Sequence, residues 1–219
     1  MKKTVADLFS PEDGSAFIPL MWGGRKEEPA DVAARADATM SALVHSVPED
    51  SSWELFWMRI ADDDLSYSPA PITAAGLAAL ASRQARRDAT YKLSEATTLQ
   101  LLLFAGNTDT GPLASFALSA GAEQTYVGNS CTVVLEQEYP LGTAEAAVDL
   151  FRELVRIWQP ESAILCTDRT VTEIDDLYAT YAGYATWISE GTFGVPPGLR
   201  SAAWEHFGDG TLLTAVNGQ

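Results

Sequence analysis

The sequence predicts an α+β fold in which helices pack over one face of a mixed, largely antiparallel sheet. Segments with apolar residues at helical spacing occur between short segments rich in aliphatic and aromatic residues. Three consecutive strand-like segments are joined by short polar or Gly/Pro connections, which is typical of antiparallel neighbours. With 219 residues the chain is long enough to bury a sizeable core, and we expect one domain over residues 1–219.

Three segments have the pattern of helices. Residues 29–45 and 72–87 place apolar side chains on one face, and the second segment ends in arginines that complement the helix dipole. Residues 143–158 have the most regular amphipathic pattern, with Thr143 in position to cap the first turn. Pro160 follows the last turn, where its ring stops the helix. We therefore expect three main helices.

Shorter apolar segments predict strands. They comprise residues 53–61, 97–105, 113–120, 130–137, 162–167 and 184–190. The first of them is apolar on both sides, as in a central strand, and a polar loop over residues 62–71 follows it. Residues 172–183 predict a short helix or turn. Near the C-terminus, Asp209 and Gly210 separate two further segments, which is a strong signal for a hairpin.

The chain is strongly acidic, with 14 basic and 30 acidic residues, a net charge of −16 and a pI near 4.3. Such a field repels nucleic acid and anionic membranes, because phosphate contacts need cations. No apolar run approaches the roughly 20 residues that span a bilayer, and the N-terminus lacks the apolar core of a signal peptide. We expect a cytoplasmic protein whose charge attracts a basic partner, although many bacterial cytosolic proteins are simply acidic.

The predicted strand 162–167 ends in a thiol and a hydroxyl, and strand ends often carry catalytic groups. The chain has two cysteines, Cys131 and Cys166, two histidines, His45 and His206, and none of the usual zinc-binding motifs. A catalytic cysteine needs a nearby base, and nothing in the sequence brings a histidine to Cys166. We expect both cysteines to be small buried residues, and we expect no catalytic residue, metal or cofactor.

Two acidic clusters are candidate contacts for a basic surface on a partner. One follows the predicted strand 53–61, and the other lies at the start of segment 172–183. Their members are Asp62, Asp63, Asp64, Glu173, Asp175 and Asp176. Each cluster has an ordinary alternative, because adjacent carboxylates in a loop are often just solvated and those at a helix start interact favourably with its dipole. The alternating ligand pattern of a calcium-binding loop is missing from the first cluster.

Six tryptophans are many for a chain of this length. Four of them lie inside predicted elements, where we expect core positions; these are Trp53, Trp57, Trp158 and Trp187. Trp22, in the segment PLMWGG, and Trp204 are less constrained. A tryptophan in a loop can anchor a binding surface, so Trp22 is a candidate anchor, with packing in the core as the alternative.

The C-terminal half resembles a known family. The segments LFRELVRIWQPESAIL, YATWIS, GVPPGLR and GDGTLLTA together resemble the immunity protein 52 family of bacterial polymorphic toxin systems. The likeness is closest over residues 143–217 and extends more loosely over most of the chain. It implies a non-enzymatic cytosolic antidote that binds a cognate toxin, often a nuclease delivered by a contact-dependent or type VI system.

The resemblance and the residues lead to the same expectation. An acidic protein without a catalytic constellation can cover the basic active-site face of a nuclease toxin, with stoichiometric binding and fast steered association. Two other classes stay open on the sequence alone, a hydrolase that uses a pair of carboxylates and a non-catalytic scaffold protein.

Overall fold

The computed structural model describes residues 3–48, 53–61, 66–91, 96–106, 108–123, 128–172, 183–191 and 202–215. The helical segments are α1 (Val5–Leu8), η1 (Pro11–Asp13), α2 (Pro29–Ser46), α3 (Ala74–Tyr91), α4 (Ala144–Trp158) and α5 (Asp168–Thr172). The strands are β1 (Ala16–Trp22), β2 (Leu55–Ile60), β3 (Tyr67–Pro69), β4 (Thr97–Ala105), β5 (Ala114–Ala120), β6 (Asn129–Leu135), β7 (Ser162–Thr167), β8 (Ala185–Ser189), β9 (Ala202–Phe207) and β10 (Gly210–Ala215).

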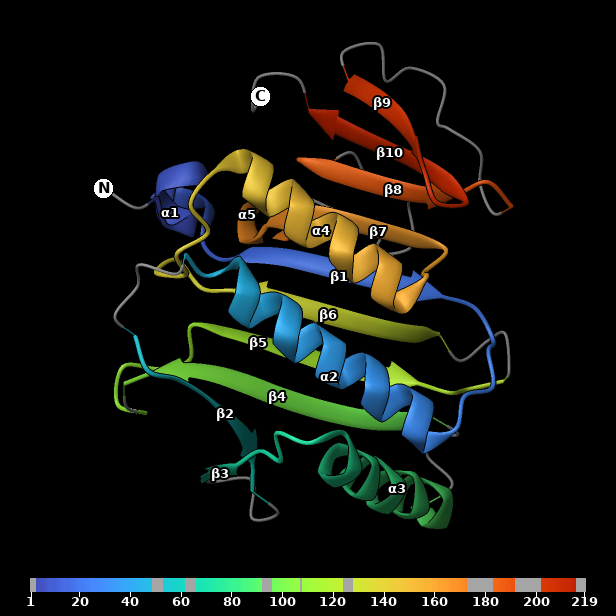
Figure 1. Ribbon diagram of the computed structural model, residues 1–219. Helices are drawn as coiled ribbons and strands as arrows, with labels where there is room; N and C mark the ends of the chain where they lie inside the picture. Colours follow the sequence, from blue (N-terminus) through green and yellow to red (C-terminus); the bar gives the residue numbers. More distant parts are fainter. Residues whose placement is uncertain are drawn as a thin grey trace.

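One ten-stranded sheet runs through these strands, in the order β3-β2-β4-β5-β6-β1-β7-β8-β10-β9 (Figure 1). Every pairing between the described strands is antiparallel. The predicted α+β class and the antiparallel character of the sheet are therefore confirmed. The prediction of a mixed sheet is wrong for these strands, because none of them has a parallel neighbour.

Strand β1 lies in the middle of the sheet and was not predicted from the sequence. It pairs with β6 along its whole length, but its ladder with β7 skips Ile18 and Pro19. Proline has no N–H to donate, so a proline inside an apolar segment normally indicates that the segment is not a central strand. Here the gap on the β7 side accommodates Pro19. As a result, β1 joins β2 to β6 on one side with β7 to β10 on the other.

Helices α2 and α4 lie side by side in front of the sheet (Figure 1). The predicted cap of α4 is confirmed, because the Thr143 hydroxyl accepts a hydrogen bond from the Ala146 N–H at 3.1 Å. At the other end of α4, the Trp158 indole N–H donates to the Thr39 hydroxyl of α2 at 2.9 Å, inside the core. Helix α3 packs against α2 and β4. That all helices pack over a single face of the sheet stays a prediction.

The core lies between helices α2 and α4 and the sheet. Strands β1, β5 and β6 each alternate strictly between buried and less buried residues, so one face of each strand contributes to the core. The buried face of α4 contributes Ala147, Leu150, Phe151, Leu154, Val155 and Trp158. All of them except Leu150 belong to the apolar stripe that the helical spacing predicts, whereas Ala144, which the spacing also places in the stripe, is exposed.

Three predictions near the first edge of the sheet are wrong. Residues 62–71, predicted as a loop, contain the edge strand β3, which spans only three residues and ends at Pro69. Strand β2 lies beside this edge instead of at the centre of the sheet. It begins at Leu55, so Trp53 precedes the strand and is 41% exposed, not buried as predicted. The aromatic content of the segment indicated burial, but the ladder starts two residues later.

Candidate functional site

The six predicted acidic contacts lie outside the residues that the structure describes. Asp62, Asp63 and Asp64 fall between β2 and β3, and Glu173, Asp175 and Asp176 follow α5. Their proposed role in binding a basic surface therefore stays a prediction.

Trp22 is a core residue. It ends β1, is 5% exposed and stacks on Trp158, with 5.4 Å between the ring centroids. The guanidinium of Arg25 covers the ring from 5.0 Å. The prediction of a free loop tryptophan is wrong, since the segment before Gly23 is a strand, and the alternative of core packing is confirmed. A contact with a partner would require an exposed surface that Trp22 lacks here.

Cys166 occupies the end of β7 as a buried residue, 2% exposed. Burial, with a smaller effect from the charge of Asp168, raises the pKa of the thiol to about 11. The thiolate fraction at neutral pH is then on the order of 10⁻⁴, so the group is a poor nucleophile. Cys131 is also free and buried, and burial raises its pKa as well. Both cysteines occupy the structural positions that the sequence predicts.

Asp168 has a structural role at the same strand end. It begins α5, and its carboxylate accepts a hydrogen bond from the Ser15 N–H at 3.0 Å. The carboxylate lies so close to Gly14 that a Cβ there would meet it at 2.4 Å. Gly14 also has a φ of 79°, which favours glycine. Asp168 therefore fixes the entry of the chain into β1.

Two features are absent from the described part of the chain. Within it, no group of three or more His, Cys, Asp or Glu side chains is arranged to hold a metal ion. No described helix combines the length and the apolar character needed to cross a membrane.

An open hollow lies at one end of the sheet, where β2 and β5 begin and β4 ends. It has a volume of about 750 Å³ and is lined by Trp53, Glu54, Ala105, Gly106, Thr110, Gly111, Pro112, Leu113 and Glu138. We call it the Trp53 hollow. Glu54 and Glu138 are both exposed, and no lysine, arginine or histidine is among the lining residues. The lining therefore combines one exposed indole, two carboxylates and an apolar wall.

Backbone hydrogen bonds fix the wall of the Trp53 hollow. The Gly106 N–H donates to the Glu54 carbonyl at 3.0 Å, and the Leu113 N–H donates to the Leu103 carbonyl at 2.7 Å. The Glu136 N–H in turn donates to the Leu113 carbonyl at 2.9 Å. Gly106 and Gly111 have φ angles of 74° and 80°, which bend the chain where other residues would be strained. The hollow is thus held open by the sheet itself.

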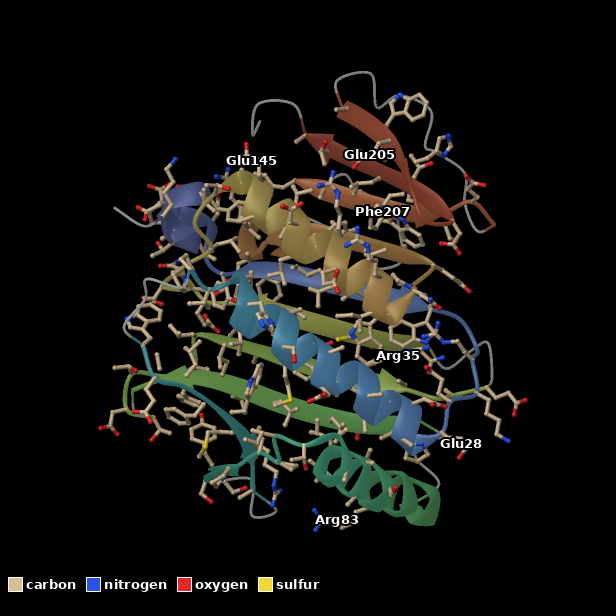
Figure 2. All side chains as sticks on the ribbon, in the orientation of Figure 1. Glu28, Arg35, Arg83, Glu145, Glu205 and Phe207 are labelled. Carbon is tan, nitrogen blue, oxygen red and sulfur yellow. The ribbon has the colours of Figure 1, made fainter. Side chains whose placement is uncertain are left out.

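Two other hollows in the described residues are lined by cations. One, of about 830 Å³, lies beside α3 and includes Arg59 and Arg83 in its lining. The other, of about 490 Å³, lies between the end of α4 and the β9–β10 hairpin and includes Arg156, whose guanidinium lies 4.9 Å from the Phe207 ring centroid. Figure 2 shows Phe207 and Glu205 on β9 near α4, and the Glu205 carboxylate forms an ion pair with Arg152. Neither hollow has both carboxylates and an exposed tryptophan in its lining.

Comparison with known proteins gives a family. The sequence profile of immunity protein 52 matches residues 16–218. No curated protein matches the chain significantly. Among solved structures, the Pseudomonas aeruginosa T6SS protein PA0821 is similar, with a TM-score of 0.52 and 10% sequence identity over 92% of this chain and 68% of that chain. At this identity the likeness shows a shared fold. Since the profile covers nearly the whole chain, the protein belongs to the immunity protein 52 family.

Proposed function

We propose that this chain is an immunity protein that neutralises one cognate toxin by stoichiometric binding and transforms no substrate itself. The observation that carries the proposal is the family match over residues 16–218. The similarity in fold to a T6SS protein supports delivery of the toxin by a type VI system. The high pKa of the Cys166 thiol supports a non-catalytic role for the one strand end that resembled an active site.

The charge of this chain supports a proposal for the chemistry of the toxin. A net charge of −16 favours a basic partner, because opposite fields accelerate encounter and orient it. Nuclease active sites hold phosphates with cations, so a nuclease presents the kind of face that an acidic protein can cover. We propose a nuclease toxin, and therefore a cytoplasmic site of action. The two acidic clusters around residues 62–64 and 173–176 are proposed contacts on this basis.

Co-expression tests the proposal. The adjacent toxin gene, lethal when expressed alone, is expected to be tolerated when this chain is made in the same cell, and the two proteins should co-purify. A matched control replaces this chain by one carrying a proline in the middle of α4, Leu150→Pro, which disrupts the core helix. Continued killing in the presence of soluble wild-type chain, with no complex formed, would remove the proposed function.

A further inference from the structure

We propose that the Trp53 hollow is a toxin-contact site that receives an arginine side chain of the toxin. This inference rests on the proposed function and deepens it, because it assigns a location and a ligand chemistry to the binding. Three observations carry it: an exposed indole, two carboxylates that have no cationic partner among the described residues, and a wall that backbone hydrogen bonds fix.

The indole is the first element. Trp53 is 41% exposed, so its ring presents a large apolar face to solvent next to a hollow. Tryptophan offers the strongest π-face for a cation, and arginine is the cation most often found on one. Buried tryptophan and arginine side chains also contribute most to the energy of protein interfaces. Trp204 is more exposed, at 65%, but it lies on β9 and lines none of these three hollows.

The carboxylates are the second element. Glu54 and Glu138 line the hollow and are exposed, and no described residue forms an ion pair with either of them, whereas Glu27 and Glu205 are each paired with an arginine. A planar guanidinium can donate to a carboxylate through two N–H groups at once. An arginine entering here would lay its aliphatic stem against Leu113 and direct its charged end to the carboxylates.

The fixed wall is the third element. The hydrogen bond from Gly106 to Glu54 joins the end of β4 to the start of β2, and the one from Glu136 to Leu113 joins the end of β6 to the start of β5. A wall that is already ordered loses little conformational freedom when a ligand binds, so less of the interaction energy is lost. The hollows around Arg59 and Arg156, by contrast, each have an arginine in their lining, whereas the Trp53 hollow is lined by two glutamates and no cation. Charge complementarity therefore assigns a cationic partner to the Trp53 hollow among the three.

A small probe tests the site without the toxin. The probe is N-acetylarginine amide, followed by the indole N–H signals in a ¹⁵N spectrum of the full chain, where Trp53→Phe identifies the Trp53 signal. We expect a saturable shift of that signal with a dissociation constant on the order of millimolar, as befits a single side chain. The uncharged isostere N-acetylcitrulline amide should shift it several-fold less. The Glu54→Gln, Glu138→Gln double variant should weaken the arginine response several-fold.

The Trp204 indole signal is the internal control of the same experiment. This signal, assigned with Trp204→Phe, comes from an exposed tryptophan outside the hollow. Its chemical shift should not change when the arginine probe is added. Equal movement of both signals, or an equal response to the citrulline probe, would overturn the site, because the response would then be non-specific.

Measurements of toxin binding distinguish a failure of this inference from a failure of the proposed function. Trp53→Ala and the Glu54→Gln, Glu138→Gln variant should each weaken toxin binding at least tenfold, while Trp204→Ala changes it less than threefold. If the wild-type chain protects cells and the hollow variants bind as tightly as the wild type, the arginine site is wrong and the proposed function stands. If the wild-type chain neither protects nor binds, the proposed function fails.

Discussion

Glu27 is a buried carboxylate that ties the β1–α2 connection to α4. Its side chain is 4% exposed and lies between the guanidinium groups of Arg25 and Arg35. Arg25 also donates to the carbonyl groups of Trp158, at 2.9 Å, and Gln159, at 3.3 Å, which end α4. Burial lowers the pKa of Arg25 although Glu27 acts to raise it. The carboxylate thus compensates two partly buried cations at a helix end.

Removing that charge should destabilise the protein. Glu27→Gln leaves two arginines, each about a quarter exposed, without their shared carboxylate, and we expect a loss of about 2 kcal/mol in the free energy of unfolding. Urea denaturation measures the loss. Glu28→Gln, at an exposed neighbouring position, is the matched control and should change the free energy by less than about 0.5 kcal/mol. Equal effects of the two substitutions would show that the ion pairs of Glu27 with Arg25 and Arg35 have no structural role.

The buried thiol of Cys166 makes stability depend on alkaline pH. Its pKa is near 9 in the unfolded chain and about 11 in the fold, so the unfolded state loses the proton first. The resulting stability is fully present below pH 9 and is lost as the pH rises through 11, by about 2 kcal/mol. Cys166→Ala removes this contribution, while Cys131 and Tyr139, whose pKa values burial also raises, titrate in both proteins.

Urea denaturation at pH 8.5 and pH 11 measures the difference. Between these two pH values, the free energy of unfolding of the wild type is expected to fall by about 2 kcal/mol more than that of Cys166→Ala. The same loss in both proteins would show that Cys166 is accessible to solvent in the native state, against its buried position.

At the scale of elements, the N-cap of α4 allows a direct test of local design. Thr143→Ala removes the acceptor of the Ala146 N–H and should cost about 1 kcal/mol of stability. Thr143→Ser keeps a hydroxyl in the same place and should remain within about 0.5 kcal/mol of the wild type. Thermal or urea unfolding checks both, and a neutral Thr143→Ala would mean that the core packing of α4 alone fixes its first turn.

Most elements were predictable because their signal is local. The spacing of apolar residues and the capping threonine placed α4 within one residue, and the segment 97–105 coincides with β4. Strand β1 was missed because Pro19 opposes a strand locally, and only its pairing with β6 offsets that preference. The order of the strands depends on such long-range pairing, and no spacing rule in the sequence encodes it.

The site was less predictable than the elements. Trp53 was predicted to be buried and is exposed, and Trp22, for which a loop anchor and core packing were both open, is buried. Both lie at strand boundaries, where one or two residues decide between core and surface. The polar run before Trp53 and the adjacent Glu54 were the available signals that it faces solvent. Glu138 joins the same hollow only through the fold, since it is 84 residues away from Glu54 in the chain.

At the scale of the whole molecule, the charge of −16 should govern how fast the toxin is bound. Charge reversal to lysine at both predicted clusters should lower the association rate at least tenfold in low salt and flatten its dependence on ionic strength. The positions to change are Asp62, Asp63, Asp64, Glu173, Asp175 and Asp176. Stopped-flow mixing with the toxin measures the rate, and an unchanged rate and salt dependence would exclude these clusters as contacts.

The central claim is that this chain works by occupying one toxin molecule, and stoichiometry tests it most directly. Purified chain is titrated into a fixed amount of its cognate toxin, and residual toxin activity and the mass of the complex are measured together. The account predicts that activity falls linearly to zero at a fixed molar ratio, where light scattering shows one stable complex. Inactivation by a small fraction of that amount, with the toxin chemically altered and no complex present, would show an enzyme and contradict the account.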